Sequence, residues 1–210
     1  MTRPDPTVIV SALSKRTVAE QTRRPEYPVH AHFVNRWSSR AFDSRPVEED
    51  VLYTVLEAAR WAPSSGNGQP WRFIVARTEE ERERFRSFIR PGNRVWSDRA
   101  PALVLLVSYT LNANGEPGGS HAFDAGAAWG IIASQAALLG LNTRAIGGFD
   151  HRLAREVLHI PEEYDLHAVI TLGYRGDKSV LPETLQEREV PTDRRSLNEL
   201  VHEGVFQAKE

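Results

Sequence analysis

The stretch that most constrains the fold is AFDAGAAWGIIASQAALL, residues 122–139. As a helix it would be apolar around nearly its whole circumference, whereas an ordinary surface helix carries a single apolar stripe. Such a helix must be covered on several sides, so we expect it to be central. Gly140 follows it at the position where a glycine commonly ends a helix.

Both helices and strands are predicted around this segment. Helical spacing of apolar residues and helix-start signals predict helices over residues 47–60, 79–88, 151–158 and near 196–203. Apolar runs of strand character lie at residues 72–77, 101–109 and 166–174. The two kinds of element intermix without a strict alternation, which favours an α+β fold over a doubly wound sheet.

The first part of the chain differs in composition from the rest. It is polar and carries prolines at positions 4, 6, 25 and 28. We interpret residues 1–30 as an N-terminal extension or arm, with a short helix near residues 8–22. The domain proper is predicted to occupy residues 31–210.

The charge balance excludes several classes of partner. The chain has 26 basic and 28 acidic residues and a formal net charge of −2, so no overall field draws it to nucleic acid or to an anionic membrane. An anion site would have to be built locally. No apolar run approaches the ~20 residues of a membrane span, and the N-terminus lacks the apolar core of a signal peptide. We therefore expect a cytoplasmic protein.

Thiol and metal chemistry are also disfavoured. The chain has no cysteine, which excludes disulfides, thiol nucleophiles and thiolate metal ligands. His30 and His32 would share one face of a strand, but no carboxylate or third histidine stands at metal-ligand spacing. We predict no metal site.

Three short motifs carry groups suited to binding a ligand. The first is NRWSSRAFD, in which Arg36, Ser38 and Arg40 alternate. Two guanidiniums and a hydroxyl at this spacing are able to hold a phosphate through charge-assisted, bidentate hydrogen bonds. The alternative interpretation of this motif is a solvated helix terminus.

The second motif is the loop SSGNGQ, residues 64–69, which follows the helix stopped by Pro63. Its glycines and serines allow the backbone to approach a flat ligand closely, and Asn67 and Gln69 add amide donors and acceptors. A turn rich in small residues is the alternative. A serine hydrolase is disfavoured because the G-x-S-x-G elbow is missing.

The third motif is AIGGFD, residues 145–150. Gly147 and Gly148 follow a short apolar strand and are able to aim two consecutive amides at one ligand atom. A tight turn is the alternative. The motif differs from the G-x-G-x-x-G fingerprint, so a Rossmann dinucleotide site is not predicted.

Taken in order, the stretches RWSSRAF, EAARWAPSSGNGQPWRFIV, LGLNTRAIGGFD, LGY and RRSLNELV resemble the nitroreductase family of FMN-dependent oxidoreductases. The resemblance covers about residues 33–205 and leaves the N-terminal extension outside. It implies a nitroreductase-like α+β fold, with a central mixed or antiparallel sheet surrounded by helices. It also implies an intertwined homodimer with two FMN sites at the subunit interface.

The resemblance assigns roles around the flavin ring. A loop from the neighbouring subunit lies along the flavin in this family, and its counterparts here are Pro63, Ser64, Ser65, Asn67 and Gln69. The backbone amides of Ile146, Gly147 and Gly148 match the stretch that reaches flavin N5 and O4. Asn93 stands where many members place an amide against the ring.

The resemblance also assigns phosphate ligands. Arg36 and Ser38 match the phosphate-binding pair of the opening motif, with Trp37 between them and Arg40 leaning toward the flavin pyrimidine. Arg194 matches the C-terminal basic ligand, and Arg195 is the alternative register. The segment before these two arginines, RGDKSVLPETLQEREVPTD, is longer than the family pattern.

The function implied by the resemblance is the reduction of small-molecule acceptors, such as nitroaromatics or quinones, at the expense of NADH or NADPH. The expected mechanism is ping-pong hydride transfer through flavin N5. The cofactor carries the redox chemistry, so no catalytic residue is predicted. Two alternatives stay open: a flavin reductase that supplies a monooxygenase, and a flavin-binding protein with little turnover.

Overall fold

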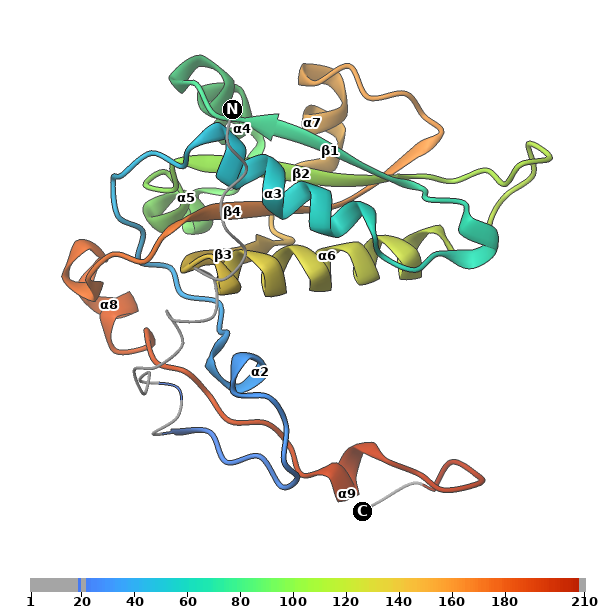
Figure 1. The fold of residues 1–210 in the computed structure, drawn as a ribbon. Coiled ribbons are helices and arrows are strands. Elements are labelled where there is room, and N and C mark those ends of the chain that lie inside the picture. The colour runs from blue at the N-terminus through green and yellow to red at the C-terminus, as the bar shows by residue number, and fades with distance from the viewer. Residues whose placement is uncertain (1–18, 20–21, 208–210) are drawn as a thin grey trace.

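The computed structural model describes residue 19 and residues 22–207, so the helix expected near residues 8–22 lies largely outside the described residues. At the centre is a four-stranded antiparallel sheet in the order β1-β2-β4-β3 (Figure 1). Its strands are β1 (Trp71–Ala76), β2 (Ala102–Tyr109), β3 (Leu141–Ile146) and β4 (Tyr164–Tyr174). The strands form close to the predicted positions, which confirms the α+β class.

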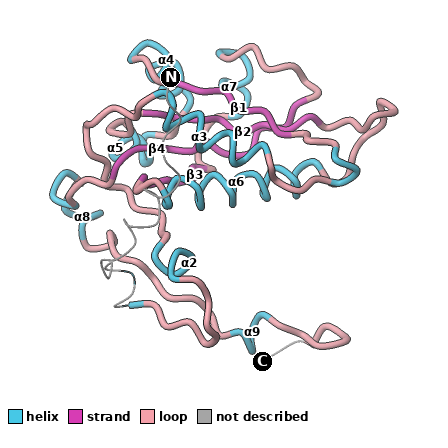
Figure 2. Tube along the Cα trace, viewed as in Figure 1, coloured by secondary structure: helices cyan, strands magenta, loops and turns pink. Residues whose placement is uncertain are grey.

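Helices cover both faces of the sheet (Figure 2) because the central strand β2 is apolar on both sides. Successive side chains of a strand point to opposite faces. On one face of β2, Leu103, Leu105 and Val107 pack in a hydrophobic core with α4 (Glu79–Phe88), α5 (Pro91–Ser97) and α7 (His151–Val157). On the other face, Ala102, Val104 and Leu106 pack in a second hydrophobic core with α3 (Glu49–Arg60) and α6 (His121–Leu138).

Helix α6 is central, as expected, but it is not covered all round. Ala128 and Ile132 are buried against α3 and the sheet. On another side of α6, Gly126 and Gly130 are exposed, and Phe123 is 82% exposed. Packing within one chain therefore leaves part of the apolar surface of α6 without cover. Neither α6 nor any other described helix is long and apolar enough to cross a membrane.

The helix-start signals in the sequence are confirmed. Thr78 and Glu81 form the capping box of α4. Asp150 accepts a hydrogen bond from Leu153 N at the start of α7 (2.9 Å). The last helix is shorter than expected, because α9 spans only Leu197–Leu200.

Several short helices were not expected. They are α2 (Ala31–Asn35), α5, α8 (Glu183–Gln186), and the 3-10 turns η3 (Ser65–Asn67) and η4 (Lys178–Val180). The strand expected at His30 and His32 is wrong, because His30 caps α2 and His32 lies inside it. One or two turns of helix span too few residues to leave a clear apolar period in a sequence.

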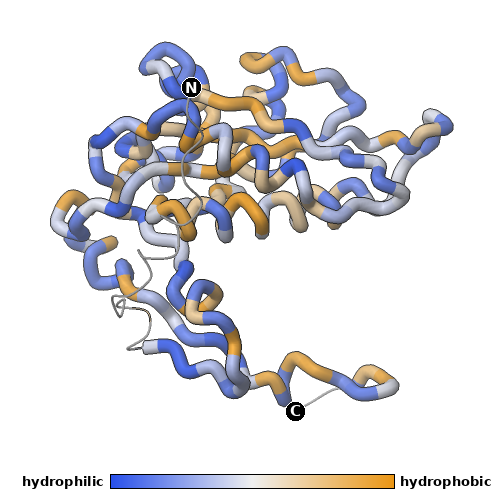
Figure 3. The backbone as a smooth tube through the Cα atoms, viewed as in Figure 1, coloured by the Kyte–Doolittle hydropathy of each residue, from blue (hydrophilic) through white to orange (hydrophobic). Residues whose placement is uncertain are grey.

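Two segments from opposite ends of the chain run side by side away from the sheet (Figure 1). We call residues 22–35 and 190–207 together the terminal arm; its first segment includes residues 22–30 of the N-terminal extension. Within it, Arg23 Nε donates to Thr192 O (2.9 Å) and Leu197 N donates to Glu26 Oε1 (3.0 Å). Large apolar side chains of the arm are exposed, and Figure 3 shows apolar residues along its C-terminal part. The exposed side chains are Tyr27, Val29, Phe33, Val190, Leu197, Leu200, Val201, Val205 and Phe206.

Candidate functional site

The segment 36–41 is held in place from two sides. On one side, the buried carboxylate of Glu189 accepts hydrogen bonds from Ser39 Oγ and from the backbone N–H groups of residues 40 and 41, at 2.5, 2.5 and 3.1 Å. On the other side, Asn142 and Arg144 of β3 donate to the carbonyls of residues 39 and 38. The segment is therefore fixed, although it forms no helix or regular strand.

A cavity of about 430 Å³ lies beside this segment, and arginines dominate its lining. The residues that line it are Arg23, Arg36, Trp37, Ser38, Arg40, Arg144, Arg188, Val190, Thr192 and Arg194. None of these described residues is acidic. Guanidiniums gathered in this way favour an anion, and their planar forks suit the oxygens of a phosphate or carboxylate. We call this space the arginine cavity.

The cations of the arginine cavity repel one another. Burial lowers the pKa of Arg36 below its usual value, and the charge of Arg194 lowers it further. Burial likewise lowers the pKa of Arg144, and Arg40 adds to that effect. Arginine nevertheless stays protonated in proteins, so the shifts reflect repulsion between cations and the cost of their burial. An anion among them would relieve both.

Trp37 leaves a buried polar atom without a partner beside this cavity. Its indole Nε1 makes no hydrogen bond to any described residue, although buried polar groups nearly always have a partner. The guanidinium carbon of Arg175 lies 4.9 Å from the centroid of the Trp37 ring. Next along the chain, Ser38 Oγ accepts from Arg36 Nη1 at 3.4 Å. A ligand with acceptor oxygens would satisfy the unpaired indole donor.

The glycine pair lies just beyond the end of β3, together with Asn93. Asn93 Nδ2 donates to Gly148 O at 3.2 Å. A Cβ on Gly148 would lie 2.7 Å from Asn93 Nδ2, whereas a Cβ on Gly147 would meet nothing within 4 Å. Ile146 is buried and Gly147 is exposed. The backbone at Gly147 is therefore open to a ligand, and β3 connects it to Arg144, roughly 10 Å back along the strand.

The loop from Pro63 to Gln69 has a strained backbone. Its φ angle is positive at Gly66 (55°), Asn67 (54°) and Gln69 (46°), a region that residues with side chains seldom adopt. Hydrogen bonds inside the loop hold this shape: Gln69 N donates to Ser64 Oγ (3.1 Å), and Gln69 Nε2 donates to Asn67 O (2.9 Å). Most of the loop is exposed. Backbone strain of this kind clusters at binding sites.

Within one chain, this loop lies far from the arginine cavity. Ser65 N donates to Asp124 Oδ2 near the start of α6 (3.2 Å), whereas His32 Nε2, just before the opening motif, contacts Ser134 Oγ (2.6 Å). Positions 124 and 134 are about 15 Å apart along a helix that rises ~1.5 Å per residue. Figure 1 shows the loop and α2 near opposite ends of α6. A single chain therefore does not bring all three motifs together.

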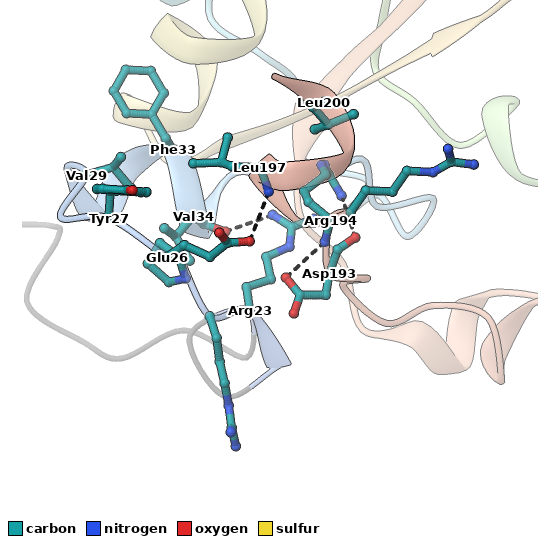
Figure 4. A pocket seen from close by; sticks show the side chains of 13 residues that line it. Arg23, Glu26, Tyr27, Val29, Phe33, Val34, Asp193, Arg194, Leu197 and Leu200 are labelled. Carbon is teal, nitrogen blue, oxygen red and sulfur yellow. Dashed lines mark hydrogen bonds between the residues drawn. The ribbon is translucent and has the colours of Figure 1, made fainter. Parts of the chain in front are cut away.

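Of the two C-terminal candidates, Arg194 lines the arginine cavity and Arg195 does not. Both arginines are exposed. Arg194 Nη1 donates to the carbonyls of Thr192 and Asp193, at 3.2 Å each. Arg195 lines a more apolar cavity of about 350 Å³ in the terminal arm, to which Arg194 also contributes (Figure 4). This placement favours Arg194 as the residue of the cationic site.

Four residues of this region were missed by the sequence analysis: Arg23, Arg144, Arg188 and Glu189. Arg144 had a usable signal, because it precedes Ile146 by two positions and so shares a strand face with it. Arg188 and Glu189 lie in the long segment before Arg194, and Arg23 lies in the N-terminal extension. Neither segment carries a motif.

The comparisons with known sequences agree with this picture. The sequence profile of the nitroreductase family matches residues 34–95, which include the opening motif and the strained loop. A putative NADH dehydrogenase/NAD(P)H nitroreductase of Archaeoglobus fulgidus is 30% identical over 147 residues, which cover 68% of this chain and 83% of that protein. The FMN reductase (NAD(P)H) of Bacillus subtilis is 27% identical over 181 residues, which cover 77% of this chain and 72% of that protein.

A solved structure agrees as well. The crystal structure of an oxidoreductase containing FMN superposes on this chain with a TM-score of 0.87 and 40% sequence identity. The match covers 93% of this chain and 100% of that chain. Similarity over so much of both chains extends beyond the motifs to the order and packing of the elements.

Proposed function

This chain belongs to the nitroreductase family, and on that premise we propose that it is an FMN-binding, NAD(P)H-dependent oxidoreductase. Its acceptors are small molecules, with nitroaromatics and quinones as the expected classes. The arginine cavity carries the proposal, because it offers the phosphate dianion of FMN a concentrated positive charge on a nearly neutral chain. Relatives whose names include FMN or NAD(P)H support it.

The residues present fit both ends of FMN. Arg36, Ser38 and Arg194 bind the phosphate, since all three line the arginine cavity. The described residues that line this cavity include no aspartate or glutamate. The open backbone at Gly147 and the amide of Asn93 hold the edge of the ring. When bound, FMN supplies the redox chemistry, accepting two electrons from the nicotinamide and passing them to the acceptor. No side chain is assigned as an acid or a base.

The working molecule in this proposal is a homodimer in which each chain completes the site of the other. The loop 63–69 is shaped for a flat ligand but lies far from the arginine cavity of its own chain. The exposed side of α6 and the exposed apolar residues of the terminal arm offer surface to a second copy. Symmetric pairing would then bring the loop of one chain to the cavity of its partner.

The proposal divides the chain as the sequence suggests. Residues 31–210 form the FMN-binding domain, and residues 1–30 are an extension to it. We place the enzyme in the cytoplasm, because a chain without cysteine suits a reducing compartment.

The direct test is the absorption spectrum of the purified protein, before and after incubation with FMN. We expect flavin bands that bleach when NADH or NADPH is added in the absence of oxygen. Protein without flavin bands, even after FMN has been supplied, would refute the proposal. Flavin bands that do not bleach would point instead to a flavin-binding protein with little turnover.

A flavin reductase is the second candidate, because the Bacillus subtilis relative is named an FMN reductase. In that case the reduced product is free flavin, which leaves to serve a monooxygenase. Steady-state kinetics with free FMN and with a nitroaromatic, at the same NAD(P)H concentration, separates the two candidates. A higher kcat/KM for free FMN would favour the flavin reductase.

A further inference from the structure

Arg23 belongs to the N-terminal extension, yet its side chain joins the two segments that carry the proposed phosphate ligands. Its Nη1 donates to Val34 O and to Arg36 O, both at 2.7 Å, and its Nε donates to Thr192 O at 2.9 Å. Figure 4 shows Arg23 between the segment of Val34 and that of Arg194. One guanidinium therefore holds the backbone of Arg36 next to the backbone two residues before Arg194.

These contacts use only part of the guanidinium. An arginine side chain has five N–H donors, and three of those of Arg23 point to the three carbonyls. No described residue accepts a hydrogen bond from its Nη2. Arg23 is only 9% exposed, and it lines the arginine cavity together with Arg36 and Arg194. A buried cation, two of whose donors have no acceptor among the described residues, thus lies beside the two proposed ligands.

The charge of Arg23 adds to the same cluster. Burial lowers its pKa, Arg194 and Arg36 lower it further, and Asp193 acts in the opposite direction. Because all three arginines stay protonated, they repel one another until an anion lies among them. Holding the three cations together is therefore electrostatically favourable with a phosphate bound among them and unfavourable with a neutral ligand.

We propose that Arg23 is a positioning residue of the phosphate site, which sets the spacing between Arg36 and Arg194 and makes FMN the preferred ligand over unphosphorylated flavin. The inference rests on the proposed function. It makes part of the N-terminal extension a component of the site, although the family motifs leave the extension outside.

The test measures binding rather than turnover. The full-length apoprotein is titrated with FMN and with riboflavin, which has the same ring system but no phosphate. Quenching of flavin fluorescence gives the two dissociation constants. Arg23→Gln removes the charge and breaks the link between the two segments. Arg24→Gln is the matched control, because Arg24 is exposed and makes no hydrogen bond to a described residue.

We expect Arg23→Gln to weaken FMN binding by about 10-fold or more and to leave riboflavin binding at the wild-type value. Arg24→Gln should leave both constants unchanged. Arg23→Lys keeps the charge, but its single nitrogen cannot reproduce the fork that spans the three carbonyls. It should also weaken FMN binding selectively, and it replaces Arg23→Gln if that variant does not fold. Equal losses for FMN and riboflavin, or no loss for either, would overturn the inference.

The inference and the proposed function fail in different ways. If the wild-type protein binds neither FMN nor riboflavin, the proposed function fails. If the wild type prefers FMN and the Arg23 variant keeps the whole preference, only the role of Arg23 fails. If the wild type binds both flavins equally well, there is no phosphate site for Arg23 to position, and flavin binding itself still stands.

Discussion

Single residues decide where this nearly neutral chain is able to hold an anion. Arg36 and Arg194 are distant in sequence but line one cavity, and each charged hydrogen bond to an anion bound there would contribute about 1.5–3 kcal/mol. Glu189 has the opposite sign and a different task. Its buried carboxylate accepts hydrogen bonds from backbone N–H groups of the opening motif, and it also pairs with the guanidinium of Arg40 (Nη1 to Oε2, 3.6 Å).

Arg36→Ala separates phosphate binding from redox chemistry. We expect the variant to bind FMN about 10–150-fold more weakly, because it loses one charged hydrogen bond of about 1.5–3 kcal/mol. Its turnover number should recover substantially at saturating FMN, since Arg36 acts on the phosphate end of the cofactor. FMN titration of the apoprotein, followed by kinetics at saturating FMN, checks both points. A variant that binds FMN normally would rule out Arg36 as a ligand.

Gly148→Ala tests the contact between the glycine pair and Asn93. The new Cβ would lie 2.7 Å from Asn93 Nδ2, so that side chain must move and give up its hydrogen bond to Gly148 O. We expect a loss of about 1 kcal/mol in the free energy of unfolding of the apoprotein. Gly147→Ala is the matched control, because its Cβ meets nothing within 4 Å. Equal denaturation midpoints for the two variants would contradict the prediction.

At the scale of elements, α6 separates the parts of the proposed site. The strained loop is bound to Asp124, near the start of α6. Helix α2 contacts α6 nearer its other end, where His32 of α2 meets Ser134 of α6. The contact between α2 and α6 also helps to position the opening motif, because Arg36 follows α2 directly. We therefore expect the protonation state of His32 to affect the position of Arg36, a proposed phosphate ligand.

The His32 contact should be sensitive to pH. Burial lowers the pKa of His32, and His30 and Arg36 lower it further. The folded protein therefore binds this proton less readily than the unfolded chain, whose histidine has a pKa of about 6.5. The contribution of His32 to stability is fully present above about pH 6.5 and is lost as the pH falls toward the folded pKa.

Chemical denaturation between about pH 7.5 and pH 5.5 checks this prediction. The free energy of unfolding should fall across that range, and it should fall less steeply in His32→Gln. The half-buried His202 offers a control position, because the contacts of its ring among the described residues are with Phe206 and with Gln207 N (3.2 Å) and none of them is with α6. The same slope for the wild type and His32→Gln would show that His32 is not responsible.

At the scale of the whole molecule, a single chain leaves apolar surface exposed and the parts of the proposed site apart. One side of α6 and the terminal arm expose apolar residues, and the strained loop lies far from the arginine cavity of its own chain. A symmetric dimer would account for these features together, because the same pairing would bury the apolar surface and exchange the two loops. The proposed enzyme is therefore expected to be a dimer at micromolar concentration.

Mixing two variants that each bind FMN weakly tests the exchange of loops. Arg36→Ala disables the cavity, and Asn67→Pro disables the loop because proline cannot adopt the positive φ found at that position. In a mixed dimer, one site carries both defects and the other carries neither. Random mixing should restore about a quarter of the sites.

The measurement is FMN binding, at a concentration too low to fill either single variant, after the variants are unfolded and refolded together. Each variant refolded alone is the control. If cavity and loop of one site come from the same chain, every site keeps a defect and mixing restores nothing.

The sequence by itself determined the local structure and much of the motif chemistry. The capping box depends on Thr78 and Glu81, which are three positions apart, and β2 depends on one continuous apolar run. Both features can therefore be predicted from a short stretch of sequence. The family resemblance likewise depends on short stretches in a set order. It was sufficient to nominate Arg36, Ser38 and the glycine pair, and the structure places Arg36 and Ser38 in one cavity.

Only the tertiary structure decided which distant residues meet. It brought Arg23 and Arg144 to the arginine cavity and set Glu189 behind the opening motif. It also placed the strained loop away from that cavity in its own chain. The physical reason is that these contacts join segments far apart in sequence, through side chains that bond to backbone groups. Backbone carbonyls and N–H groups are the same in every residue, so no spacing or periodicity in the sequence records them.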